Sequence, residues 1–184
     1  MTNGAPNTLG PMPATRRMRT VDEAVVRAGV REMFAVAADV EGWARLLPHY
    51  RYVRFREGDA RRGVVEMSAN RPFGPLNWPT WWLSQMEIQE RAPDGSRPAI
   101  RFRHIGGITT HMDVEWSFTA VSGGTLVSVV HLWDGPAWPV IRTVAARAVI
   151  GPVFIHGIAS RTVAGLARAA EQGQTSKPVA TGAQ

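Results

Sequence analysis

With 184 residues, the chain fits a single domain that is large enough to enclose a hydrophobic core. It has no cysteine, which excludes a disulfide framework and thiolate metal sites and makes a cytoplasmic setting the simplest expectation. The net charge of +6 does not indicate a nucleic-acid partner, because the excess comes mostly from side chains in or beside the two termini, namely Arg16, Arg17, Arg19 and Lys177.

Both ends of the chain have the composition of disordered tails. The first stretch, MTNGAPNTLGPMPATRR, is rich in Pro, Gly, Asn and Thr and lacks the apolar core of a signal peptide. The last stretch, EQGQTSKPVATGAQ, has a similar composition. We therefore predict a disordered tail over 1–18, one folded domain over 19–172, and a second disordered tail over 173–184. No apolar run approaches the length of a transmembrane helix, so we expect no stable membrane insertion.

The first half of the chain predicts one strand, two short helices and the beginning of a long meander. The segment VDEAVVRAG (21–29) predicts a strand, and REMFAVAADVEGWARLLPHY then predicts two short helices. Three hairpins follow, with turns at EGDARRG, APDGSRP and SGG. The total is about seven strands, of which about six form a consecutive antiparallel meander.

From Ala137 onward the apolar residues recur at steps of three and four, the spacing of one stripe of a helix. The stripe includes Ile155, Ala159, Val163 and Leu166, and its length predicts a helix of about thirty residues. The pair Gly151–Pro152 interrupts it, and we expect a kink there because proline removes an internal hydrogen bond.

The order of these elements resembles the helix-grip fold of the START-like (SRPBCC, Bet v 1-like) superfamily. The segments that carry the resemblance include ADVEGWARLLPHYRYV, VEMSANRP, WWLSQ, IRFRHIGG, MDVEWSF and GTLVSVVH, and they are most similar to the bacterial polyketide cyclase/dehydrase branch. The resemblance implies an α+β fold in which a curved antiparallel sheet wraps around a long C-terminal helix. It also implies an apolar cavity between them that holds a hydrophobic ligand, in a protein that is sometimes an enzyme.

Alternation along the strands predicts which side chains face that cavity. In PLNWPTWW (75–82), the alternation turns Trp82 inward and Trp81 outward, and Trp78 is expected as a lid at the cavity mouth. The expected ligand-binding residues are Met67, Ala69, Trp78, Trp82, Ser84, Phe102, Met112, Trp116, Trp133 and Ile155. Three polar residues are expected at strand ends on the same wall: Arg71, His104 and His131.

These three polar residues are the candidate catalytic groups. Polyketide cyclisation requires an enolate to attack a carbonyl, so an arginine can stabilise the developing oxyanion while a histidine moves protons. The resemblance implies that Arg71, in SANRP, corresponds to the cavity arginine of family cyclases. The alternative for Arg71 is a structural role, closing the mouth or pairing with Glu66 or Asp134, and both histidines can equally be structural residues.

The sequence predicts neither a metal site nor a cofactor. The histidines have no compact spacing with carboxylates, and no glycine-rich loop follows a strand to open a helix. Three functions therefore remain open: a cofactor-independent polyketide cyclase or aromatase, a non-catalytic carrier of a lipid or quinone, and an interaction module. The interaction module would dock a membrane or protein surface through Trp81 and Leu83 outside the sheet and the apolar residues near Phe154. The partner common to the first two is a hydrophobic small molecule, and a homodimer is a further possibility.

Overall fold

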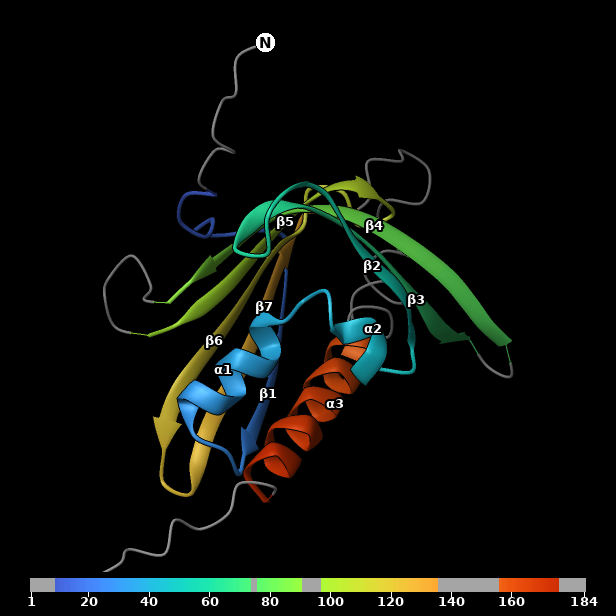
Figure 1. The fold of residues 1–184 in the computed structure, drawn as a ribbon. Helices are drawn as coiled ribbons and strands as arrows, with labels where there is room; N and C mark the ends of the chain where they lie inside the picture. Colours follow the sequence, from blue (N-terminus) through green and yellow to red (C-terminus); the bar gives the residue numbers. More distant parts are fainter. Residues whose placement is uncertain (1–8, 74–75, 91–96, 136–155, 176–184) are drawn as a thin grey trace, which may run out of the picture.

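A long antiparallel sheet arches over the helices, which lie on its concave side (Figure 1). The computed structural model describes residues 9–73, 76–90, 97–135 and 156–175. The elements, in chain order, are β1 (Met18–Val26), α1 (Val30–Ala38), α2 (Trp43–Leu46), β2 (Tyr50–Gly58), β3 (Arg62–Phe73), β4 (Leu76–Gln89), β5 (Ala99–Gly107), β6 (Asp113–Val121), β7 (Gly124–Trp133) and α3 (His156–Thr175).

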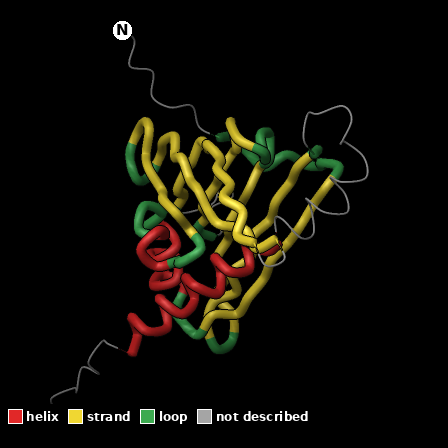
Figure 2. The backbone as a smooth tube through the Cα atoms, turned by 90° about the vertical axis from the view of Figure 1, so that its right-hand side faces the viewer, coloured by secondary structure: helices red, strands yellow, loops and turns green. Residues whose placement is uncertain are grey.

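The seven strands follow the order β1-β7-β6-β5-β4-β3-β2, and every neighbouring pair is antiparallel. Strands β2 to β7 therefore form the expected meander, and β1 adds to its free edge beside β7. Figure 2 shows the helices gathered on one side of the strands. Successive side chains of a strand point to opposite faces of the sheet. On β7, buried and partly exposed residues accordingly alternate from Gly124 to His131. The predicted α+β helix-grip fold is confirmed.

The helices supply the other side of the core. In α3, the buried side chains are Ala159, Val163, Leu166 and Ala170, which repeat at the predicted spacing of three and four. Helix α1 contributes Met33 and Ala37. The N-terminal part of the predicted long helix, with the expected kink at residues 151–152, lies outside the described residues. None of the described helices is long and apolar enough to span a membrane.

The convex face of the sheet is less exposed than the sequence predicts. In IRFRH, alternation along a strand turns Arg101 and Arg103 away from Ile100 and Phe102 and so predicts a solvated outer face for them, yet Arg101 is only 1% exposed. The reason is that residues 9–17, which the composition assigns to a disordered tail, lie against this face. The backbone N–H of Leu9 donates to Glu87 Oε2 at 3.1 Å, and Gly10 O accepts from Arg101 Nη1 at 2.9 Å. The domain limits of 19–172 stay a prediction, but this N-terminal segment contacts the sheet.

Candidate functional site

A cavity of about 70 Å³ lies between the concave face of the sheet and the helices, and five aromatic side chains form much of its wall. Trp43 is at the centre of this aromatic group. Its ring centroid lies 5.4 Å from that of Trp116, 5.7 Å from Tyr50 and 6.1 Å from Phe102. Trp82 continues the wall, with its ring 6.1 Å from Tyr50. These rings pack edge-to-face or at a tilt, the arrangements that aromatic pairs favour, and together they form an apolar surface.

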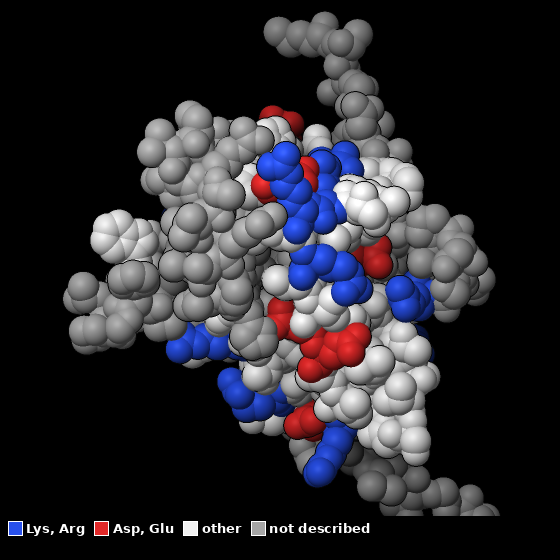
Figure 3. Space-filling view, turned by 180° about the vertical axis from the view of Figure 1, so that it is seen from behind, with Lys and Arg blue, Asp and Glu red and all other residues white. Residues whose placement is uncertain are grey.

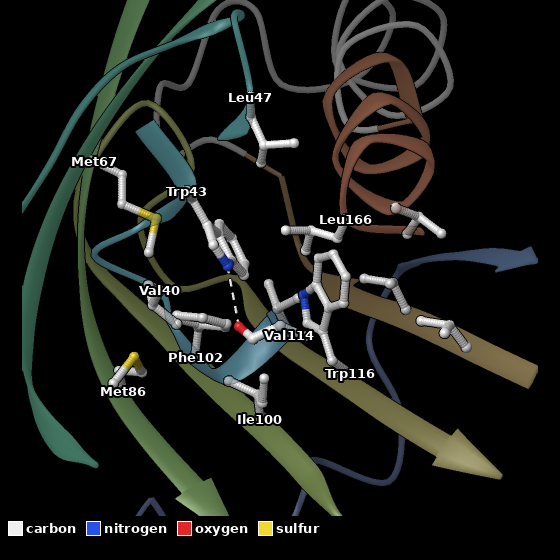
Figure 4. Close-up of a cluster of buried hydrophobic side chains, with 14 of the residues drawn as sticks. Val40, Trp43, Leu47, Met67, Met86, Ile100, Phe102, Val114, Trp116 and Leu166 are labelled. Atoms are coloured by element: carbon white, nitrogen blue, oxygen red, sulfur yellow. Dashed lines mark hydrogen bonds between the residues drawn. The ribbon is translucent and has the colours of Figure 1, made fainter. Parts of the chain in front are cut away.

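Helix α2 positions Trp43, although it is only four residues long. The indole Nε1–H donates to Ala37 O, in the last turn of α1, at 3.0 Å, and this bond turns the ring toward the sheet (Figure 4). Asp39 connects the two helices by accepting from the backbone N–H of Gly42 at 3.2 Å. Trp43, the least exposed of the five aromatic side chains of the wall, is thus held by the α1–α2 connection rather than by a strand.

His104, on β5, is the most constrained polar group of the wall. It is 6% exposed, and its Nδ1 lies 2.6 Å from the hydroxyl of Thr109. The Trp82 ring stacks on the imidazole at 6.2 Å with an interplanar angle of 18°. Thr109 reaches the cavity because the chain turns back after β5, with the N–H of His104 donating to Met112 O at 2.9 Å. The ring therefore has a fixed orientation toward the cavity.

His131, on β7, lines the same cavity, two strands away from His104 in the sheet. It is 8% exposed, and its Nδ1 lies 3.3 Å from the hydroxyl of Thr20. Thr20 is its direct cross-strand partner on β1. Both cavity histidines therefore have Nδ1 against a threonine hydroxyl, an arrangement that orients each imidazole ring.

A third histidine–threonine pair closes the cavity on the helix side. The hydroxyl of Thr162 lines the cavity and donates to Ile158 O at 2.8 Å. Because its single proton is used there, the hydroxyl accepts from His49 Nε2–H at 3.1 Å, which fixes the tautomer of His49. Burial, with a smaller contribution from Arg161, lowers the pKa of His49 below its usual range.

The structure brings seven of the predicted site residues together around the cavity. These are Met67, Trp82, Phe102, His104, Met112, Trp116 and His131. Their roles in binding or catalysis stay predictions. Trp43, Tyr50, Thr109, Val114, Ile158, Ala159 and Thr162 also line the cavity and were not predicted as site residues. The helical stripe of the sequence includes Ala159, whereas Trp43 is on a four-residue helix and Tyr50 stands just before a register shift in β2 that interrupts the alternation.

The remaining predicted residues lie elsewhere. Ala69, Ser84 and Trp133 are buried but do not line the cavity, and Trp78 is 63% exposed. The backbone of Arg71 pairs with Trp78 in the β3–β4 hairpin, but its side chain and the whole of Ile155 lie outside what the structure describes.

Two of these buried residues carry a polar side-chain atom, and only one of the two atoms has a hydrogen-bond partner among the described residues. Trp133 donates through Nε1–H to Thr110 O at 2.9 Å, so it holds the turn that carries Thr109. Ser84 is 0% exposed and stands opposite His104 on the neighbouring strand. Its Oγ has no hydrogen-bond partner among the described residues, a state that is rare for a buried hydroxyl.

The cavity is chemically simple. No carboxylate is among the described residues that line it, so its polar groups there are imidazoles and hydroxyls. Within the described ranges, no group of three or more His, Asp or Glu side chains could hold a metal ion. An apolar wall with a few oriented polar groups is the usual form of a small-molecule site. It can bind a hydrophobic molecule and transfer protons to or from a polar group on it.

Comparisons with known proteins agree with this architecture. The family model described as "Polyketide cyclase / dehydrase and lipid transport" matches residues 26–153. The chain is similar to the crystal structure of Zhui aromatase/cyclase from Streptomyces sp. R1128, with 20% identity, a TM-score of 0.66, and coverage of 90% of this chain and 98% of that one. No curated protein matches the chain.

Two other solved structures share the fold. One is TTHA0849 from Thermus thermophilus, with 16% identity, a TM-score of 0.67, and coverage of 84% of this chain and 98% of that chain. The other is StfQ, a di-domain aromatase/cyclase from the steffimycin biosynthetic pathway, with 15% identity, a TM-score of 0.57, and coverage of 87% of this chain and 52% of that one. Together with the family model, these likenesses confirm the resemblance that the sequence suggested.

Proposed function

Since the chain belongs to the polyketide cyclase/dehydrase and lipid transport family, we propose that its cavity binds a largely apolar carbonyl-bearing molecule and guides its cyclisation. The observation that carries the proposal is the placement of two buried histidines, His104 and His131, on one aromatic wall. The aromatic side chains orient the ligand and exclude water, and the imidazoles supply the proton transfers.

The reaction needs no electron transfer, so protein side chains alone can carry it. One imidazole removes a proton from the CH₂ between two carbonyls, and the resulting enolate attacks a second carbonyl carbon of the same molecule. A C–C bond forms, and the attacked oxygen takes a proton from an imidazolium to become a hydroxyl. The neutral imidazole then removes a proton from the carbon next to the hydroxyl, and the protonated imidazole donates a proton to the departing hydroxyl. Water leaves, a C=C bond forms, and both imidazoles return to their starting protonation states.

The role of Arg71 in this scheme rests on the resemblance alone. An arginine at the cavity mouth would stabilise the oxyanion as it develops on the attacked carbonyl. Arg71 is in β3 and its backbone pairs with Trp78. Replacing it tests the role directly, because an oxyanion-stabilising group affects turnover more than ligand uptake.

The size of the cavity limits the ligand. A volume of about 70 Å³ is well below the roughly 300–1,000 Å³ of typical ligand pockets. A multi-ring ligand therefore enters only if side chains of the wall rearrange, and a small or extended one enters more readily. Uptake of a graded series of naphthols and single-ring phenols, measured by calorimetry, would establish this limit.

The second candidate is a non-catalytic carrier of a lipid or quinone. The lack of a carboxylate among the described lining residues favours it, because the cavity then offers only imidazoles as strong proton-transfer groups. The first experiment for both candidates is native mass spectrometry of freshly purified protein, followed by extraction and identification of the bound molecule. Empty protein, together with no thermal shift on addition of quinones or acyl lipids, would contradict a carrier.

The catalytic candidate is tested by His104→Asn. Asparagine places an amide nitrogen near the position of Nδ1, so it keeps a partner for Thr109 but cannot act as a base at neutral pH. We expect turnover of a linear poly-β-ketone thioester to fall by about 100-fold, within the range for loss of a general base, while ligand uptake is retained.

The matched control is His111→Asn. His111 is exposed, lies outside the cavity, and has a φ of 70°, a backbone conformation that asparagine also tolerates. Its turnover should equal that of the parent. Equal turnover of His104→Asn and His111→Asn would refute the assigned role of His104.

A further inference from the structure

An exposed apolar patch lies on the convex face of the sheet, on the opposite side from the cavity. It consists of Trp81 and Leu83 on β4 and Ile105 on β5, and we call it the Trp81 patch. Trp81 is 53% exposed and Ile105 is 42% exposed. Large exposed apolar side chains that cluster on one face indicate an interaction surface.

Two glycines of β5 keep the Trp81 ring uncovered. A Cβ atom at Gly106 would lie 3.7 Å from Trp81 Cζ3 and 3.2 Å from Leu83 Cβ, so the ring extends over the bare backbone of β5. Gly107 has a φ of 89° and approaches the backbone of Trp81 too closely for a side chain. The pairing register shifts between Leu83 and Ser84, which leaves Ile105 as the extra residue of a bulge.

Arginines of β2 flank the patch. Arg51 Nη1 donates at 3.3 Å to the hydroxyl of Ser68, which is the direct cross-strand partner of Trp81. Arg54 is the cross-strand partner of Glu66, and Glu66 in turn is the partner of Leu83. The two arginines are therefore one strand removed from the apolar side chains, on the same face of the sheet.

The cations beside the patch outnumber the acids among the described residues. Glu66 accepts from Tyr52 Oη at 2.7 Å and from Arg56 Nε at 2.6 Å, so its charge is already compensated. Arg54 instead stacks its guanidinium over the Tyr52 ring, 4.8 Å from the centroid. Within the part of the chain that the structure describes, neither Arg51 nor Arg54 has an ion pair with a carboxylate, although charges of both signs interleave over the rest of this face (Figure 3).

We propose that the Trp81 patch docks the protein on an anionic lipid surface. A tryptophan ring has an apolar body and a polar N–H and therefore favours the boundary between headgroups and acyl chains. Arginines beside it gain electrostatic attraction from anionic headgroups.

Charge favours a lipid surface over a second copy of the chain. In an interface between two copies, the guanidinium groups of Arg51 and Arg54, which form no ion pair within the described residues, would have to find carboxylates on the partner. The acid that adjoins the patch, Glu66, is already paired with Arg56. An anionic headgroup layer supplies negative charge at every position. Docking would bring the protein to a source of hydrophobic ligand, but it does not depend on the proposed reaction.

The test is flotation of the full chain with vesicles of phosphatidylcholine alone or with about 30% phosphatidylglycerol, a composition chosen to give a clearly anionic surface. We expect binding to the anionic vesicles and a loss of binding in high salt, because salt screens exposed charges. Arg51→Gln with Arg54→Gln should weaken binding by about 25-fold, since each basic residue near such a surface contributes about fivefold. Trp81→Ser should weaken it by about tenfold.

Matched controls come from the opposite edge of the sheet. Val25 on β1 is 61% exposed, and Arg19 on the same strand is exposed. Val25→Ser and Arg19→Gln should bind as the parent does, and circular dichroism should show that every variant is folded. Ligand uptake, measured without vesicles, should be unchanged in all of them.

The proposal is overturned if the parent does not bind anionic vesicles, or if it binds them and the patch variants bind as well as the controls. It is also overturned if the parent forms dimers in gel filtration that Trp81→Ser abolishes while vesicle binding is absent. That outcome would assign the patch to a protein interface instead.

Discussion

The two faces of this sheet share the same strands but bury their side chains in different ways. On β5, Phe102 and His104 point to the concave side, where the ring of Trp43 lies against Phe102 and that of Trp82 stacks on His104. Arg101 and Arg103 alternate with them on the convex side, and Arg101 is as buried as its apolar neighbours. Burial by itself therefore does not distinguish the ligand-binding face from the other one.

What distinguishes the faces is the kind of group that covers them. The concave wall is covered by helices that leave a cavity, whereas the convex face is covered by residues 9–17 and by its own ion pairs. Arg103 Nε lies 2.8 Å from Asp113 Oδ1, and Arg101 Nε lies 3.6 Å from Glu115 Oε2. Burial lowers the pKa of Arg101, and the nearby Glu115 and Asp113 oppose that shift. Around Arg101 and Arg103 the convex face is thus a closed polar layer, in contrast to the exposed Trp81 patch on the same face, and the concave face keeps room for a ligand.

The largest expected effect contrasts tryptophans on the two faces. Trp116 is 4% exposed and contacts Trp43, so Trp116→Ala should lower the free energy of unfolding by about 3–5 kcal/mol through lost burial and a new cavity. Trp81→Ala, at a site 53% exposed, should lower it by about 0.5 kcal/mol or less. Urea titrations of both variants measure the two losses in the free energy of unfolding. Equal losses would mean that the tryptophans of the two faces contribute alike to stability.

The contrast between Trp81 and Trp82 could be predicted from the sequence because side chains on a strand alternate. The same rule predicts His104, His131 and Trp116 on the concave face, and all three line the cavity there. Alternation needs a regular strand, however, and Trp43 is on a four-residue helix whose position depends on a hydrogen bond to Ala37. No local pattern in the sequence encodes that bond.

The covering of the convex face could not be predicted for a similar reason. A composition rich in Pro, Gly, Asn and Thr indicates disorder because it offers little apolar surface to bury. In residues 9–17 a few specific contacts prevail, chiefly the N–H of Leu9 on Glu87 and the guanidinium of Arg16 on Asp134. These contacts join residues far apart in the sequence, so only the assembled sheet brings them together.

The second prediction removes this cover. Deletion of residues 1–17 exposes Arg101 and Glu87 and removes the buried side chain of Leu9, which is 4% exposed. We expect a loss of about 2–3 kcal/mol in the free energy of unfolding, from one buried leucine and the charge-assisted hydrogen bonds that it accompanies. Because part of the loss is electrostatic, the difference from the parent should shrink as salt is raised from about 0.05 to about 1 M.

Deletion of residues 1–8 alone is the matched control, since it leaves Leu9 and its contacts in place. Its thermal and urea midpoints should stay near those of the parent, and the cavity should bind ligand in both deletion variants. Equal stability of the two deletions would show that residues 9–17 do not stabilise the sheet.

The smallest expected effect is a difference between the two faces in how their contribution to stability depends on pH. On the helix side of the cavity, burial lowers the pKa of His49, so the folded state favours the neutral ring. The stability that this gives is fully present above the unfolded value of about 6.5 and is lost as pH falls through the lower folded pKa. On the convex face, the backbone N–H of Arg17 and the guanidinium of Arg16 lower the pKa of Asp134, whose contribution is lost only in more acidic solution, as pH falls below about 4.

Unfolding measured by urea between about pH 7 and pH 5 therefore reports on His49 and not on Asp134. His49→Gln keeps a donor for Thr162 and should flatten the decline in stability over this interval, whereas Asp134→Asn should leave the decline unchanged. Below about pH 4 the order should reverse, with Asp134→Asn the less acid-sensitive of the two. A parent whose stability is constant across the milder interval would contradict the neutral state assigned to His49, and with it the view that the concave face is the more sensitive of the two to mild acid.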